Sequence, residues 1–218
     1  MDLKGKKVVF LGDSITAGSS ATKAENVFHQ VMKKDLGLKE ALNYGISGTR
    51  IARQSVKSET SQFDLDFNVR AEELPADADF VFVFGGTNDY GHGDAPFGKE
   101  GDDTPDTFCG AVRSLFDKLI KSYGKEKIVV MTPLRRTNDE NVYGERRTVI
   151  GAPLKEFAAV IEKEAKRDGL KFVDLFRELM LNPNVEELNK KYFADGLHPN
   201  DAGHALLAKV IEEKIKNL

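Results

Sequence analysis

The chain has 218 residues, of which 40% are apolar and 31% charged, and its formal net charge is −3. This length fits a single domain with one core, and the charge balance lacks the excess of Lys and Arg that nucleic-acid binding requires. The single cysteine, Cys109, excludes an intramolecular disulfide and a cysteine-rich metal site. The first apolar run is too short for a signal peptide, and nothing approaches the roughly 20 apolar residues of a membrane span. We therefore expect a cytoplasmic protein with no membrane span.

Short apolar runs separated by longer intervals predict five strands along the chain. Most of them are almost continuously apolar, as in "FVFVFGG" and "KIVVMTP". Strands of this kind are covered on both faces, which is typical of a parallel sheet between two helical layers. The predicted strands span residues 7–12, 41–46, 79–85, 127–132 and 171–176.

Helical periodicity fills the intervals between the later strands. Residues 107–123 carry apolar side chains at spacings of three and four and are followed by Gly124. Residues 153–168 begin at Pro153 and stop at Gly169, and the last helix begins near Asn200 or Asp201. The alternation predicts one α/β three-layer domain spanning residues 1–218, with right-handed crossovers.

Three long polar intervals follow predicted strands, at residues 50–68, 87–106 and 134–152. The carboxyl ends of parallel strands are where ligands bind in an open α/β sheet. We therefore expect these intervals to form the walls of the functional site.

Ser14 follows the first predicted strand in "VVFLGDSITAG". Its position at a strand end suits a nucleophile, but serine is also a common turn and helix-capping residue. A serine nucleophile needs a base and a group that orients the base. The motif "DGLHPN" supplies both, because Asp195 lies three residues before His198. The alternative is that this segment only forms a loop and caps the last helix.

Two further glycine-rich segments follow predicted strands. In "GGTND", the side-chain amide of Asn88 can donate a hydrogen bond to an anionic oxygen, and in "GISGTR", Gly48 lets a backbone N–H approach a ligand. Each segment taken alone is equally compatible with an ordinary turn.

Together, "GDSITAG", "GISGTR", "GGTND" and "DGLHPN" closely resemble the four motif blocks of the SGNH hydrolases, also called GDSL esterases and lipases, in the order of that family. The resemblance covers the chain from Gly12 to Asn200. It departs from the family pattern at Ile15, which replaces the leucine of the family name, and at Thr87, which separates the glycines from Asn88. Neither departure removes a catalytic group.

The resemblance implies a flavodoxin-like sheet with strand order 2-1-3-4-5 and a serine esterase that needs no cofactor or metal. Ser14 would be the nucleophile, His198 the base and then the acid, and Asp195 the residue that orients the imidazole. The oxyanion hole would consist of the backbone N–H groups of Ser14 and Gly48 and the side chain of Asn88. Because His198 acts as a base only when neutral, activity should rise with pH through the histidine range.

Other enzyme classes fit the sequence less well. No G-x-S-x-G elbow of an α/β-hydrolase occurs, and "GDAPFGKE" lacks the Ser or Thr that a phosphate-binding loop needs after Lys99. The residues His92, Asp94, Asp102 and Asp103 show no recognisable metal-ligand spacing. A non-catalytic sugar-binding module on the same fold stays open as an alternative.

The polar intervals suggest a shallow site for a short acyl chain on a hydrophilic alcohol. The hypothesis is an acetyl-type esterase acting on a carbohydrate, and the alternative is a lysophospholipase or thioesterase of the same family. Asp13, Tyr90 and Phe97 are candidate substrate-contacting residues, although both rings can equally anchor their loop. Most arginines of the polar intervals are expected to form surface ion pairs, and self-association stays open. The arginines considered are Arg50, Arg53, Arg135, Arg136, Arg146 and Arg147.

Overall fold

In the computed structural model, which describes residues 1–142 and 151–218, five parallel strands form one sheet in the order β2-β1-β3-β4-β5. This confirms the predicted fold class and strand order. The strands are β1 (Lys7–Gly12), β2 (Glu40–Gly45), β3 (Phe80–Phe84), β4 (Ile128–Met131) and β5 (Lys171–Val173).

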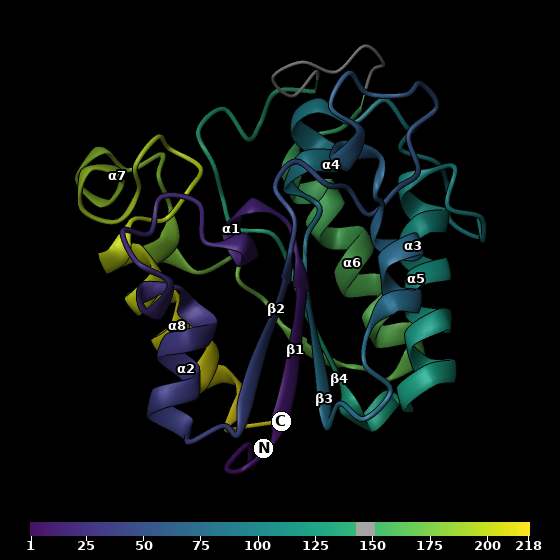
Figure 1. Ribbon diagram of the computed structural model, residues 1–218. Coiled ribbons are helices and arrows are strands. Elements are labelled where there is room, and N and C mark those ends of the chain that lie inside the picture. Colours follow the sequence, from purple (N-terminus) through teal and green to yellow (C-terminus); the bar gives the residue numbers. More distant parts are fainter. Residues whose placement is uncertain (143–150) are drawn as a thin grey trace.

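Helices cover both faces of the sheet. One face carries α2 and α8, and the other carries α3, α5 and α6, while α4 lies above the carboxyl ends of the strands (Figure 1). The α-helices are α1 (Ser14–Ala17), α2 (Phe28–Leu36), α3 (Phe67–Arg70), α4 (Thr87–His92), α5 (Phe108–Tyr123), α6 (Leu154–Asp168), α7 (Glu186–Tyr192) and α8 (Asp201–Ile215).

The central strands β1 and β3 feed two separate cores because successive side chains of a strand point to opposite faces. Val9 and Val81 belong to the core beneath α5 and α6, whereas Phe10 and Phe82 belong to the core beneath α2 and α8. All four are at most 1% exposed. Burial on both faces explains why these strands read as continuous apolar runs.

The predicted helix ends agree closely with the structure. Gly124 and Gly169 adopt positive φ angles where α5 and α6 end, and the side chain of Asn200 accepts a hydrogen bond from the N–H of Gly203 at the start of α8. Pro153 lies one residue before the first turn of α6.

The last strand is shorter than predicted, ending at Val173 instead of residue 176. The hydroxyl of Thr132 accepts hydrogen bonds from the N–H groups of Leu175 and Phe176, at 2.8 and 2.9 Å. A side chain thus replaces the backbone partner of these two residues, and the chain turns away from the sheet.

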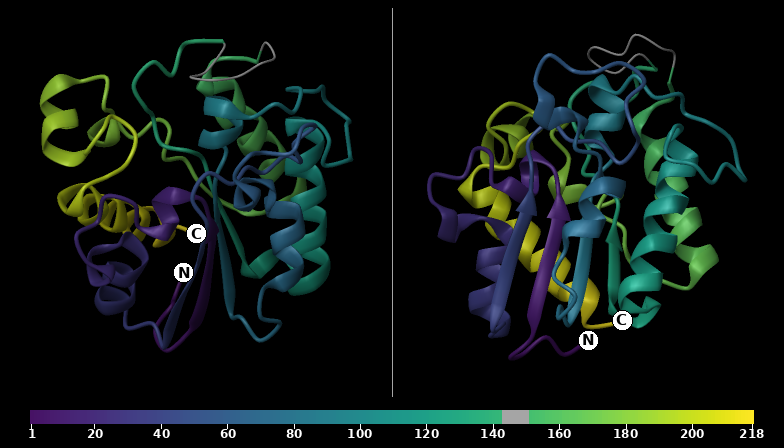
Figure 2. Two further views of the ribbon diagram at one scale, coloured as in Figure 1. Left: turned by 45° about the horizontal axis from the view of Figure 1, so that its top comes forward. Right: turned by 45° about the vertical axis from the view of Figure 1, so that its right-hand side comes forward.

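All strands run in the same direction, and the loops that follow their carboxyl ends gather at that end of the sheet (Figure 2). Strand β1 is followed in the chain by β2 on one side and later by β3 on the other, so the strand order reverses at β1. A crevice forms at such a reversal. Both termini lie at the opposite end of the sheet, where the strands begin, and the amino group of Met1 donates to the carbonyl oxygen of Ile215.

Candidate active site

Ser14 stands at the reversal point, in the first turn of α1. The Asp13 carboxylate caps this turn by accepting a hydrogen bond from the N–H of Ile15 at 3.0 Å. Gly12 makes the tight turn possible, because a Cβ at that position would lie 2.0 Å from the hydroxyl of Thr16. Ser14 Oγ lies 2.9 Å from Nε2 of His198, which comes from the other end of the chain.

His198 is oriented by Asp195, three residues earlier. His198 Nδ1 lies 2.7 Å from Asp195 Oδ2, while Asp195 Oδ1 accepts hydrogen bonds from the N–H groups of His198 and Leu197. Burial alone would raise the pKa of the Asp195 carboxyl, but these hydrogen bonds hold it below its usual value. Because an ionised carboxylate only accepts, Nδ1 donates and Nε2 presents a lone pair to the serine hydroxyl.

Gly48 and Asn88 reach the same cavity from the ends of β2 and β3. Gly48 has a φ of +79°, and a Cβ there would lie 2.1 Å from the ring of Phe63. The Asn88 side chain is buried, and its Nδ2 donates to the carbonyl oxygen of Thr49 at 3.0 Å. Both residues therefore line the same cavity as Ser14.

A cavity of about 650 Å³ brings these groups together. Its wall contains four of the five residues expected to catalyse, and Asp195 lies directly behind His198. The lining residues are Ser14, Ser19, Ser47, Gly48, Arg50, Ser58, Glu59, Thr60, Phe63, Asn88, His92, Arg136, Leu197 and His198.

Two buried charged side chains hold the cavity loops in place. Arg70 donates to the carbonyl oxygens of Gly12 and Tyr44 and to the hydroxyl of Thr49, and so connects the ends of β1 and β2 with the loop that carries Gly48. Burial lowers the pKa of Arg70 to about 10, while the nearby Asp13 opposes this effect.

The carboxylate of Asp89 holds the same loop from the other side. It accepts hydrogen bonds from the N–H groups of Ile51 and Ala52, both at 2.9 Å. Adjacent residues therefore have separate tasks: Asn88 faces the cavity and Asp89 holds the neighbouring loop.

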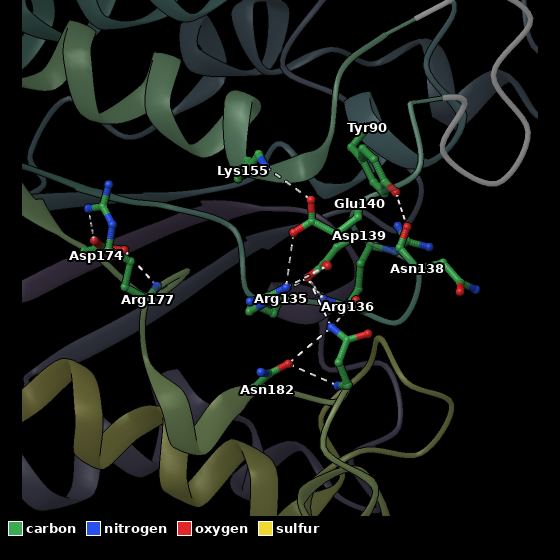
Figure 3. A network of polar contacts seen from close by, with 11 residues as sticks. Tyr90, Arg135, Arg136, Asn138, Asp139, Glu140, Lys155, Asp174, Arg177 and Asn182 are labelled. Carbon is green, nitrogen blue, oxygen red and sulfur yellow. Dashed lines mark hydrogen bonds and ion pairs between the residues drawn. The ribbon is translucent and has the colours of Figure 1, made fainter.

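The three candidate substrate-contacting residues lie outside the cavity wall. Asp13 is 2% exposed, and burial raises the pKa of its carboxyl to about 6. Tyr90 is buried, with its hydroxyl donating to the carbonyl oxygen of Asn138 (Figure 3), and Phe97 packs against Phe108 and Phe157. The two rings thus anchor their segments to the body, which is the alternative that the sequence left open.

The arginines of the polar intervals fall into two groups. Arg53 forms a surface ion pair with Asp106, as expected, whereas Arg135 pairs with the buried Asp139 (Figure 3). Arg50 and Arg136 are instead buried in the cavity wall. Arg146 and Arg147 lie outside the described residues.

Arg50, His92 and Phe63 line the cavity without having been predicted as site residues. His92 lies four residues after Asn88, a spacing that places both side chains on one face of α4. Recognition of residues 87–92 as a helix would have provided this signal. Phe63 offered no comparable signal, because its place above Gly48 depends on the tertiary fold.

His92 and Asp94, two candidate metal ligands of the sequence, have other partners. His92 contacts Arg50 and Asn88, and Asp94 accepts hydrogen bonds from the N–H groups of Ser55 and Val56. Within residues 1–142 and 151–218, no group of three or more His, Cys, Asp or Glu side chains is arranged to hold a metal ion.

The chain belongs to the GDSL-like lipase/acylhydrolase family, whose model matches residues 10–206. It is thus a carboxylic ester hydrolase. Among its relatives, an acetylxylan esterase of Geobacillus stearothermophilus is 27% identical, over 97% of this chain and 94% of the relative. A GDSL lipase of Mycobacterium tuberculosis is also 27% identical, over 97% of this chain and 82% of that protein.

Solved structures share the fold. A protein from Lactobacillus plantarum superimposes with a TM-score of 0.83 at 28% identity, over 98% of each chain. A two-domain esterase active on acetylated mannans superimposes with a TM-score of 0.66 at 25% identity, over 97% of this chain and 48% of that one. In the described part of the chain, no helix combines the length and apolar character needed to cross a bilayer.

Proposed function

We propose that the chain hydrolyses short-acyl esters through Ser14, His198 and Asp195. The proposal is carried by the continuous path from Ser14 Oγ to His198 Nε2, at 2.9 Å, and from His198 Nδ1 to Asp195, at 2.7 Å. His198 takes the proton of the Ser14 hydroxyl as Oγ attacks the ester carbonyl, and then passes it to the departing alcohol. Water, deprotonated by the same imidazole, releases the acid from the acyl-enzyme.

The oxyanion of each tetrahedral intermediate is proposed to accept hydrogen bonds from the N–H groups of Ser14 and Gly48 and from Asn88 Nδ2. Donors that are already fixed before reaction need no reorganisation when charge develops on the carbonyl oxygen. Arg70 and Asp89 supply that fixation through the loops that they hold. The whole unit is proposed to be one catalytic domain covering residues 1–218.

The substrate is proposed to be an acetyl-type ester of a carbohydrate or a similar hydrophilic alcohol. Hydroxyl-bearing side chains of Ser19, Ser47, Ser58 and Thr60 line much of the cavity, together with Glu59. Such a wall pairs with sugar hydroxyls better than with an alkyl chain. The relatives named for acetylxylan and acetylated mannans support the same class.

The first test compares the wild type with Ser14→Ala and with the matched control Ser122→Ala, an exposed serine on α5. Acetylated xylan and mannan oligosaccharides serve as substrates. Ser14→Ala should abolish acetate release, and Ser122→Ala should leave it unchanged. Acetate release that survives Ser14→Ala would disprove the nucleophile assignment, whereas sugar binding without hydrolysis by the wild type would favour the binding-module alternative.

A lysophospholipase or thioesterase is the second candidate, and the relative named as a GDSL lipase favours it. A series of p-nitrophenyl esters of increasing acyl length separates the two. We expect the highest kcat/KM at two carbons with a steady decline beyond four. A maximum at eight carbons or more would reject the short-acyl proposal in favour of the lipid substrate.

A further inference from the structure

The carboxamide of Asn88 has two different ends, and only the Nδ2 end can donate to an oxyanion. Nδ2 donates to the carbonyl oxygen of Thr49, and Oδ1 lies 3.0 Å from Nε2 of His92. Rotation of the amide by 180° would exchange donor and acceptor at both contacts. The carbonyl oxygen of Thr49 only accepts and so favours the orientation with Nδ2 toward it, while His92 Nε2 supports that orientation only if it donates.

Arg50 determines which His92 nitrogen carries the proton. Arg50 Nη2 lies 2.7 Å from His92 Nδ1. Since a guanidinium group only donates, Nδ1 must accept, and the proton of the neutral imidazole is then on Nε2. Nε2–H in turn donates to Oδ1 of Asn88, which leaves Nδ2 as the donor end.

Arg50 is itself held in one position. Its guanidinium also donates to the carbonyl oxygens of His92 and Phe63 and to the hydroxyl of Ser58, and it lies 5.8 Å from the centre of the Phe63 ring. The residue is 5% exposed. Rotation of the guanidinium would break several hydrogen bonds in a buried place, so the donor toward His92 is fixed.

We propose that Arg50 and His92 are positioning residues that aim the Asn88 amide into the oxyanion hole. Arg50 fixes the tautomer of His92, and His92, together with the carbonyl oxygen of Thr49, fixes the orientation of Asn88. The inference rests on the proposed role of Asn88 in the oxyanion hole. Neither Arg50 nor His92 needs to touch the substrate for this effect.

A double-mutant cycle between His92 and Asn88 tests the proposal, with kcat and KM measured on p-nitrophenyl acetate. Asn88→Ala should lower kcat by about 10²- to 10³-fold. His92→Phe, which keeps a ring of similar size but no donor, should lower kcat by about 10- to 100-fold and change KM by less than about 3-fold. The double variant should be no more than about 3-fold slower than Asn88→Ala, because His92 acts through Asn88.

Two further variants probe the donor and the tautomer. His92→Gln places an amide donor near Asn88 and should recover most of the activity lost in His92→Phe. Arg50→Met should lower kcat to a similar extent as His92→Phe. The matched control is Arg53→Met in the same loop, an exposed residue paired with Asp106, which should behave as wild type.

The outcomes separate this inference from the proposed function. Unchanged kcat in Asn88→Ala would refute the proposed role of Asn88. Two outcomes would overturn the positioning role. One is a large loss of kcat in Asn88→Ala with unchanged kcat in His92→Phe. The other is that His92→Phe lowers kcat by the same factor in the wild type and in the Asn88→Ala background. Long-range ¹H–¹⁵N NMR of the wild type decides the matter even if a variant does not fold: His92 should be protonated at Nε2, and protonation at Nδ1 would reject the proposal.

Discussion

Both terminal nitrogens of Arg70 lie 3.1 Å from the carbonyl oxygen of Gly12, two residues before Ser14. The same guanidinium donates to Thr49 Oγ1 at 2.9 Å and to the carbonyl oxygen of Tyr44. One side chain from α3 therefore sets the distance between the Ser14 turn and the Gly48 loop. The two backbone N–H groups of the proposed oxyanion hole depend on that distance.

Arg70→Met should lower both stability and kcat. The change leaves buried acceptors without donors, which costs about 2–4 kcal/mol in the free energy of unfolding. Urea denaturation measures this loss, and p-nitrophenyl acetate hydrolysis measures kcat below the melting range. Arg177→Met is the matched control, because Arg177 is exposed and forms only surface ion pairs, so the expected cost is less than about 1 kcal/mol. Equal losses in both variants would contradict the special role of Arg70.

Gly48→Ala should be more damaging than an alanine at another glycine of similar φ. Gly101 has a φ of +95° with no atom within 4 Å of a Cβ, so Gly101→Ala reports the cost of the backbone conformation alone, about 1–2 kcal/mol. Gly48→Ala adds a collision with the Phe63 ring. Thermal unfolding of both variants measures the difference, and Phe63→Ala in the Gly48→Ala background should recover part of the stability. No recovery would show that Phe63 is not the source of the extra cost.

The strands could be predicted from the sequence because burial on both faces leaves continuous apolar runs. The end of β5 could not be predicted, since it depends on a hydrogen bond to Thr132 from Leu175, 43 residues away in the chain. The start of helix α2 could not be predicted either: it begins after Val27, which makes no side-chain capping bond, so the usual start signal is absent. Tertiary packing of Phe28 and Met32 stabilises it instead.

The gathering of the candidate site residues could be predicted because each stands in a motif at a strand end or before the last helix. The residues that hold these side chains and their loops in place could not be predicted. Arg50 and His92 are 42 positions apart, and Arg70 reaches Gly12 across 58 positions, so only the folded chain brings these pairs together. The sequence predicts a polar loop over residues 87–92, because so short a helix, starting after Gly86, has no apolar period. That misinterpretation hid the relation of His92 to Asn88.

Asp195→Asn should lower kcat strongly while leaving the fold intact. The amide oxygen can keep the hydrogen bonds from the N–H groups of Leu197 and His198, and the amide nitrogen then faces Nδ1 of His198. Because an amide nitrogen only donates, Nδ1 of His198 must accept. The imidazole proton then lies on Nε2, which can no longer take the proton of Ser14. We expect kcat to fall by about 10²- to 10⁴-fold with little change in KM or in the melting temperature. A loss below 10-fold would mean that Asp195 does not control the tautomer.

The buried histidines His29 and His204 should make the fold sensitive to acid. Burial lowers the pKa of each to about 4 from the ordinary 6.5, so the unfolded chain binds more protons between these values and stability falls as the pH falls. At pH 5 the loss is about 2 kcal/mol for each histidine. Asp13 acts in the opposite direction, because its pKa of about 6 in the folded state exceeds its ordinary value. Its protonation offsets about 1 kcal/mol of the stability that the histidines lose at pH 5.

Urea denaturation at pH 7.5 and pH 5 should therefore show a net loss of about 3 kcal/mol in the free energy of unfolding. His29→Gln removes one titrating group, while its amide can still donate to the carbonyl oxygen of Thr16. The variant should lose about 2 kcal/mol less than the wild type over the same pH interval. A Gln substitution at His92 cannot serve as the control histidine variant, because His92 lies beside Asn88. The reference is therefore the wild type, measured at both pH values. An equal loss in His29→Gln and wild type would mean that His29 does not carry the acid sensitivity.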